Sequence, residues 1–142
     1  MISFLGKIFR CDCPVTTALD IVGDKWTLVV IKLMLLEQKK TFKEFSESNE
    51  SIAPSILSDR LKKLEKIEYL VKVKPPDNNK TNLYFLTEKG LSLTPVIMEL
   101  VLWSHNNIKP IVDISLKAAV VDIKDKNKLH QAIVKRYKEK AV

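Results

Sequence analysis

The sequence predicts a mainly α-helical chain with a small β-hairpin, and three observations carry this prediction. Segment 54–66 opens on a proline, and leucines at i, i+4 and i+7 give it one apolar face. A polar turn at 48–51 separates it from a shorter helical segment. After residue 67 the apolar period changes to two, which indicates strands. This order predicts a winged helix-turn-helix, flanked by N- and C-terminal dimerisation helices.

The N-terminal part of the chain predicts two helices. Pro14 can open a helix that runs to about Val22, and Asp24 can cap the next one. Segment 26–36 is apolar on nearly every side, so we expect it at the centre of the domain. Trp26 is then a core residue rather than a platform for a ligand.

The short helix before the polar turn begins at Thr41, which can act as its cap. Its spacing predicts that Phe42 and Phe45 face inward, while Glu44 and Glu47 face outward.

The hairpin is predicted from alternation on both sides of a polar loop at 75–81. In the first strand Lys72 and Lys74 alternate with valines, and 82–86 returns as the partner strand. If Tyr84 and Leu86 face the core, their neighbours Leu83 and Phe85 point outward and form an apolar patch. We expect the C-terminal extension or a second subunit to cover that patch, although a partner protein is also possible.

Thr87 is predicted to cap one long helix whose apolar stripe is wider than a small domain needs, which suggests a second subunit. Beyond residue 110 the period is ambiguous until Leu129, Ile133 and Tyr137 indicate a final amphipathic helix. We therefore divide the chain into a winged-helix domain at 1–110, which includes the dimerisation helices, and a helical extension at 111–142. The residues expected at the dimer interface are Val15, Leu19, Val96, Leu100 and Trp103.

Composition limits the classes of function. The 142 residues suffice for one domain with a real core, and a formal net charge of +7 favours polyanionic partners. No apolar run approaches the roughly 20 residues of a membrane span, and no secretory signal is evident, so we expect a cytoplasmic protein with no membrane partner. Glycine-rich phosphate loops, HExxH and GxSxG are absent from the sequence, which argues against an enzyme and gives no reason to expect a cofactor.

Five motifs resemble those of the HxlR-type transcriptional regulators, which are related to MarR proteins. They are CP at 13–14, LDIVGDKWT at 19–27, FKEF at 42–45, LSDRLKKLE at 57–65 and YFLTEKG at 84–90. The resemblance covers roughly residues 11–107 and implies a dimeric winged-helix protein that binds DNA. Two positions depart from the family: the wing sequence NNKTNLY at 78–84 lacks the usual proline and arginine, and Ala53 replaces a common serine cap.

A homodimer of this kind would present its two 54–66 helices to successive major grooves about 34 Å apart, so we expect an inverted-repeat operator in double-stranded DNA. The sequence does not separate repression from activation; a repressor is our working expectation. Ser55 and Ser58 can reach bases or phosphates, and Asp59 can accept a hydrogen bond from a cytosine amino group. The cations expected at phosphates are Lys62, Lys63, Lys72, Lys74 and Lys80.

Arg60 has two interpretations of similar weight: a contact to the DNA backbone, or a brace to Glu65 or Glu44. The alternative function is a winged helix used for protein contact without specific DNA binding.

Cys13, with its neighbour Cys11, is a candidate redox site because resembling proteins often keep a cysteine there, and some sense oxidants or electrophiles with it. A helix dipole, Arg10 or Lys25 could stabilise the Cys13 thiolate. The alternative, which we favour, is a half-buried structural residue at the subunit interface. Cys-x-Cys with two distant histidines lacks the spacing of a metal site. An unknown small-molecule effector also stays open.

Overall fold

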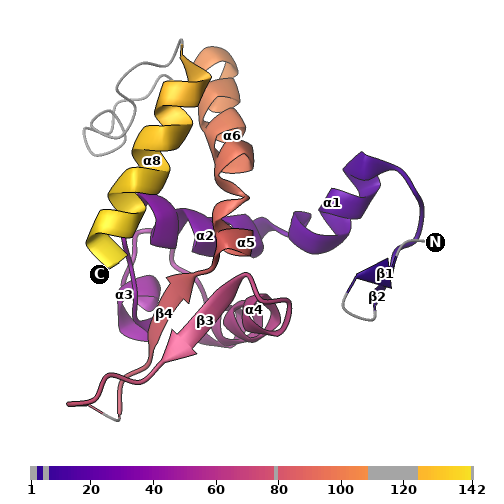
Figure 1. Ribbon diagram of the computed structural model, residues 1–142. Helices are drawn as coiled ribbons and strands as arrows, with labels where there is room; N and C mark the ends of the chain where they lie inside the picture. The colour runs from indigo at the N-terminus through magenta and orange to yellow at the C-terminus, as the bar shows by residue number, and fades with distance from the viewer. Residues whose placement is uncertain (1–2, 5–6, 79, 109–124, 142) are drawn as a thin grey trace.

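The computed structural model describes residues 3–4, 7–78, 80–108 and 125–141, and the mainly helical fold with a winged hairpin is confirmed (Figure 1). A short β1–β2 ladder near the N-terminus was not expected. The elements are β1 (Ser3–Phe4), β2 (Lys7–Ile8), α1 (Pro14–Val22), α2 (Lys25–Glu37), α3 (Phe42–Ser46), α4 (Pro54–Lys66), β3 (Leu70–Val73), β4 (Leu83–Leu86), α5 (Glu88–Leu91), α6 (Thr94–Asn107) and α8 (Lys126–Ala141).

Helix α2 forms the centre of the fold, as its all-round apolar sequence predicts. Val30, Ile31, Leu33 and Met34 are fully buried. In Figure 1, α4 and the hairpin lie below α2, whereas α6 and α8 rise above it; α1 projects sideways, away from the other helices. Trp26 packs against the core, and the Lys25 ammonium lies 4.6 Å from the centre of its ring. The position of α2 therefore sets the positions of most other elements.

Helices α3 and α4 form the helix-turn-helix. The Thr41 hydroxyl accepts a hydrogen bond from the Glu44 amide at 3.1 Å, so the predicted cap is confirmed. Pro54 opens α4 without a side-chain cap from Ala53. Phe45 is buried as expected, but Phe42 is 37% exposed, so the prediction that both rings face inward was wrong for Phe42.

The turn between α3 and α4 is tied to α2 by one lysine. The Lys32 ammonium donates to Glu37 at 2.8 Å and to Glu50, which lies in the turn. Partial burial lowers the pKa of Lys32, but the hydrogen bonds and charges of the two glutamates outweigh it, and the pKa is raised. The ammonium thus stays charged and holds the turn against the central helix.

The wing is an antiparallel pair in which Leu70 lies opposite Leu86 and Lys72 lies opposite Tyr84. Leu86 is buried and Tyr84 packs against the core, so the predicted inward pair is confirmed. Leu83 and Phe85 are half-buried, and the Lys40 ammonium lies 5.7 Å from the Phe85 ring centre. Val71, on the face of Phe85, is 45% exposed.

Thr87 caps a short helix rather than the long one that we predicted. Its hydroxyl accepts from the Gly90 amide at 3.1 Å at the start of α5, and α6 begins only at Thr94. Pro95 explains the break, because proline has no N–H to donate to the carbonyl four residues earlier and its ring crowds that carbonyl. The Thr94 hydroxyl instead donates to the Leu91 carbonyl at 2.6 Å.

The C-terminal amphipathic helix is confirmed as α8, with Leu129, Ile133 and Tyr137 buried. It contacts α2 and α6, and Lys126 and Lys138 pair with Glu99 and Glu88 at 2.7 and 3.1 Å. The ambiguous stretch at 111–123 lies outside the described residues.

Asp24 connects the start of α2 to α4. Its carboxylate accepts from the amides of Trp26 and Thr27 at 2.9 and 3.0 Å, which confirms the predicted cap. The same oxygen accepts from Arg60 Nε at 2.8 Å. Partial burial raises the pKa of Asp24, but the bonds from Thr27, Arg60 and the Trp26 amide together hold it well below its usual range.

We expect Asp24→Ala to lower the free energy of unfolding by about 1–2 kcal/mol, because it removes both the helix cap and the partner of Arg60. Asp24→Asn keeps a capping oxygen and should lose less. Because the folded-state pKa is depressed, the carboxylate stabilises the fold above the unfolded-state value of about 4, and this stabilisation is lost as the pH falls through the folded-state pKa. Urea unfolding at pH 7 and pH 3 measures both effects. The exposed Asp77 in the wing loop gives the control Asp77→Ala; equal losses from Asp24→Ala and Asp77→Ala would contradict the role of Asp24.

Candidate nucleic-acid interface

Helix α4 presents a polar face opposite its buried leucines. Ser55, Asp59, Lys62 and Lys63 are exposed, and Ser58 is half-buried on the same helix. The positions of the buried leucines fix this face, since side chains three and four residues apart share one side of a helix. A helix with one side in the core and a polar side in solvent can enter a major groove.

Arg60 is a brace, and its partners differ from those that we considered. Its guanidinium bonds Asp24 at 2.8 Å and also pairs with Asp59, whereas Glu65 and Glu44 are not its partners in the described residues. Hydrogen bonds and charge from these carboxylates raise the pKa of Arg60, Asp24 contributing most. Arg60 therefore fixes the orientation of α4 against the first turn of α2.

Asp59 lies between two cations. Lys63, one turn further along α4, approaches at 3.3 Å the same carboxylate oxygen that pairs with Arg60. Desolvation raises the pKa of Asp59, but Lys63 and Arg60 together lower it. Asp59 is thus an ionised carboxylate in the middle of the polar face, and its charge is balanced by the two cations. An amino group of a DNA base would have to compete with Lys63 for it.

The wing lysines fall into two groups. Lys72 lies on the strand face of Leu70 and Tyr84, and it lines a small hollow of about 70 Å³ with Ser58, Lys62 and Glu65. Lys72 therefore extends the polar face of α4. Lys74 and Lys80 are exposed beyond the paired part of the hairpin. Their charges are available there to the phosphates of a nucleic-acid backbone.

A second groove of about 600 Å³ lies between α3 and the wing, and the sequence argument missed it. Hydroxyls and ammonium groups are common ligands of DNA phosphates, and the first helix of a helix-turn-helix crosses the backbone. Lys43, two residues after the cap of α3, could have indicated this groove from the sequence, because it places a cation in the first turn of the short helix. The groove is lined by Thr41, Phe42, Lys43, Ser46, Lys80, Thr81, Asn82 and Tyr84.

The two thiols lie together at the start of α1 and are exposed. Cys13 occupies the cap position, and its amide donates to Cys11 Sγ at 3.3 Å. Hydrogen bonds from Thr16 and the Val15 amide lower the pKa of the Cys13 thiol. Arg10 lies 3.8 Å from Asp20, and Lys25 lies over Trp26, so both expected cations have other contacts. Within the described part of the chain no group of three metal-ligating side chains occurs.

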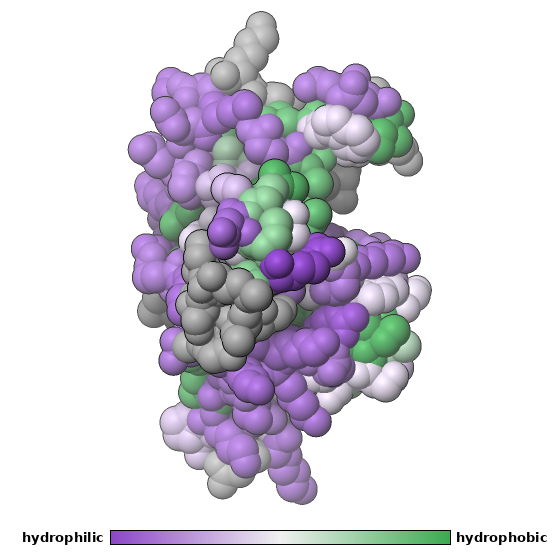
Figure 2. Space-filling model, turned by 90° about the vertical axis from the view of Figure 1, so that its right-hand side faces the viewer, coloured by the Kyte–Doolittle hydropathy of each residue, from purple (hydrophilic) through white to green (hydrophobic). Residues whose placement is uncertain are grey.

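Apolar side chains remain exposed on α1 and α6. Val15 and Leu19 lie one turn apart on α1, and Trp103 on α6 is 59% exposed. Figure 2 shows apolar groups gathered in the middle of the face that carries α1, among hydrophilic surroundings. On α6 the exposed residues Val96, Leu100 and Trp103 form a stripe distinct from the buried side of the helix. All five residues expected at the dimer interface are therefore uncovered in the single chain.

No helix among the described residues combines the length and apolar character of a membrane span. The model of the HxlR-like helix-turn-helix family matches residues 21–112. The HTH-type transcriptional regulator YodB of Bacillus subtilis is 32% identical over 99 residues, which is 69% of this chain and 88% of YodB. The HTH-type regulator YdeP of the same organism is 36% identical over 97 residues, 66% of this chain and 72% of YdeP.

Solved structures agree with the sequence relatives. PA1607, a proposed transcription factor, superposes with a TM-score of 0.61 at 30% identity, covering 70% of this chain and 68% of PA1607. The reduced form of YodB gives 0.55 at 30% identity and covers 71% of this chain and 99% of YodB. YodB has also been solved after diamide treatment, and that form gives 0.51 at 30% identity, covering 69% of this chain and 97% of YodB. With a family match across the helix-turn-helix, the wing and α6, the chain belongs to the HxlR-like helix-turn-helix family of transcriptional regulators.

Proposed function

We propose that this regulator is a cytoplasmic homodimeric repressor that recognises an inverted repeat by placing α4 of each subunit in a major groove. The observation that carries the proposal is the polar face of α4, held in one orientation by Asp24 and Arg60 and flanked by the wing lysines. The expected spacing of half-sites is one helical turn or a multiple of it.

The polar side chains of α4 and the wing fall into two groups, according to whether they would approach bases or phosphates. Ser55 and Ser58 in the first turns of α4 are the candidates for base contacts, because the N-terminal residues of a recognition helix approach base edges. Lys62 and Lys63 lie further along and suit phosphates. Lys72 supports the α4 face, while Lys74 and Lys80 extend phosphate contacts along the wing.

Dimerisation is supported by the apolar residues that one chain leaves uncovered. Large apolar side chains are exposed at helical spacing on α1 and α6, which is costly in water and supports an interface there. A C2 dimer buries the same surface on both subunits, so α1 and α6 of one subunit would meet their counterparts. Such a dimer would also set the distance between the two α4 helices.

A redox response through Cys13 is the regulatory part of the proposal. An exposed thiol with a lowered pKa at a helix start has more thiolate at neutral pH and reacts faster with oxidants. The reduced and diamide-treated forms of YodB show that a relative was studied in two redox states. Because α1 also carries Val15 and Leu19, a change at Cys13 would act next to the proposed subunit interface.

The DNA-binding role is tested by two substitutions on α4. We expect Ser55→Ala to change discrimination between operator variants, at about 1–3 kcal/mol for the base pair that it reads. Lys62→Ala should weaken binding to all duplexes alike and lower the slope of log K against log salt by about one unit. Fluorescence anisotropy on selected operators and scrambled duplexes at several salt concentrations measures both.

The control for charge is Lys128→Ala, which removes one exposed cation from the first turn of α8. This turn lies at the opposite side of the fold from α4 (Figure 1). The substitution should leave the salt slope unchanged. Equal binding of the wild type to operator and random duplexes at cellular ionic strength would refute sequence-specific recognition.

The dimer is tested by Leu100→Glu, which places a charge in the exposed apolar stripe of α6. We expect the wild type to sediment at twice the chain mass of 16.3 kDa, and the variant to sediment as a monomer that binds the inverted repeat weakly. Gln131→Glu adds the same charge to an exposed position on α8 and should stay dimeric. A monomeric wild type would rule the dimer out.

For the thiol, we expect diamide or peroxide to change the operator affinity of the wild type by about tenfold, and Cys13→Ser to remove that response while keeping reduced-state binding. Cys11→Ser, measured alongside, shows whether the neighbouring thiol takes part. An oxidant-insensitive wild type would end the redox proposal and leave the DNA-binding proposal intact.

A further inference from the structure

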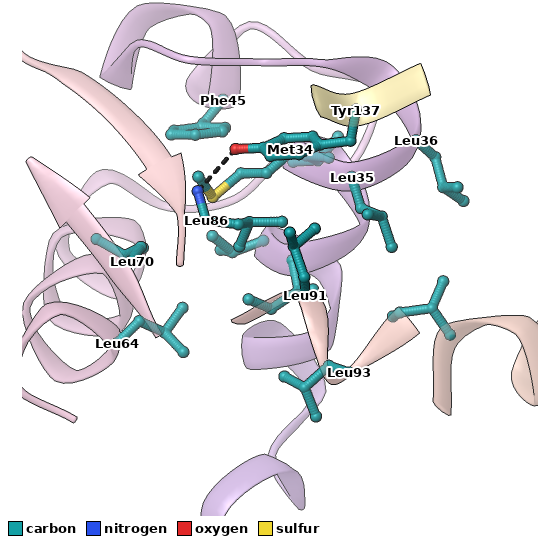
Figure 3. Close-up of a cluster of buried hydrophobic side chains, with 14 of the residues drawn as sticks. Met34, Leu35, Leu36, Phe45, Leu64, Leu70, Leu86, Leu91, Leu93 and Tyr137 are labelled. Carbon is teal, nitrogen blue, oxygen red and sulfur yellow. Dashed lines mark hydrogen bonds between the residues drawn. The ribbon is translucent and has the colours of Figure 1, made fainter. Parts of the chain in front are cut away.

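The side of strand β4 that does not pair with β3 carries backbone amides that need hydrogen-bond partners. One side of β4 pairs with β3, and the amides of Tyr84 and Leu86 point to the other side. The Tyr84 amide donates to the Lys40 carbonyl at 2.8 Å. The Leu86 amide donates to the hydroxyl oxygen of Tyr137, on α8, at 2.7 Å (Figure 3). Because a buried N–H without a partner is costly, α8 supplies what a third strand would supply.

Tyr137 is built into the core rather than laid over it. It is 5% exposed, and Figure 3 shows its ring in the cluster that contains Met34, Phe45 and Leu86. Burial raises the pKa of its phenol, although the bond from Leu86 acts in the opposite direction, so the group stays neutral at physiological pH. Leu129, two turns earlier on the same side of α8, is also buried.

The last turns of α8 also hold the linker between α2 and α3. The Lys40 ammonium donates to the Lys140 carbonyl at 2.7 Å, and a cation at a helix C-terminus is favoured by the helix dipole. Arg136 donates to the Gln38 side-chain oxygen at 3.3 Å. The linker, β4 and α8 therefore form one connected unit, so a change in the angle between the wing and α3 would disturb these bonds.

We propose that Tyr137 is a positioning residue for DNA binding, which fixes the wing relative to the helix-turn-helix through the amide of Leu86. The inference rests on the proposed DNA-binding function and adds to it an element outside the family match, which ends at residue 112, whereas α8 begins at Lys126. Tyr137 itself does not need to touch DNA. Its effect is transmitted along β4 to the loop that carries Lys80.

The test is Tyr137→Phe, which keeps the ring and removes only the acceptor. In the free protein, exchange of the Leu86 amide with solvent should become about tenfold faster, while core amides of α2 stay protected. Operator affinity should fall by about three- to tenfold, and the slope of log K against log salt should decrease as the wing contact is lost. A loss of folded protein would lower the active fraction but would not change that slope.

A double-mutant cycle with Lys80→Ala identifies the route. If Tyr137 acts through the wing, its substitution should cost less than about twofold in affinity once Lys80 is absent. The control is Tyr69→Phe, because Tyr69 is half-buried and its hydroxyl makes no hydrogen bond in the described residues. It should leave exchange at Leu86 and DNA binding unchanged.

The outcomes separate the two proposals. A wild type that binds no operator refutes the proposed function and the inference with it. A wild type that binds, combined with additive losses for Tyr137→Phe and Lys80→Ala or an unchanged salt slope, refutes only the role of Tyr137.

Discussion

The carboxylate of Asp24 makes the contacts on which the orientation of the polar face of α4 depends. It accepts hydrogen bonds from the first amides of α2, which have no partner within the helix, and from Arg60. The start of the most buried helix and the middle of α4 are therefore held by the same carboxylate. Since α2 is enclosed by the core, its direction cannot adjust freely. The orientation of α4, and with it the direction of Ser55 and Lys62, follows from that shared carboxylate.

Local signals predicted most of the elements correctly. Pro14, Asp24, Thr41 and Pro54 mark helix starts through chemistry that acts within a few residues, and the observed helices begin beside them. The break between α5 and α6 was missed although Pro95 is visible in the sequence. The cap at Thr87 correctly predicts where a helix starts, but it carries no information on where that helix ends, and Pro95 ends the preceding turn.

The surface of α4 could be predicted because helical spacing fixes which side chains share a face. Contacts between distant segments could not. Arg60 and Asp24 are 36 residues apart, and nothing in either local pattern favours that pair over Glu65 or Glu44. Alternation in β3 placed Lys72 and Lys74 together but could not show that Lys72 faces Ser58 and Lys62, because a period of two does not identify which side meets α4.

The C-terminal helix shows how an added segment can act on a shared fold. The spacing of Leu129, Ile133 and Tyr137 predicts an amphipathic helix, but only the arrangement in space shows that Tyr137 meets an amide of β4. A β-strand edge inside a small domain must be satisfied by something, and the choice of partner decides what the strand is coupled to. Where a loop or water satisfies that edge, the strand has no bond to a C-terminal helix. Where a core tyrosine satisfies it, a change that loosens α8 reaches the wing through the amide of Leu86. Under the proposed function, operator affinity would then depend on α8 as well as on α4.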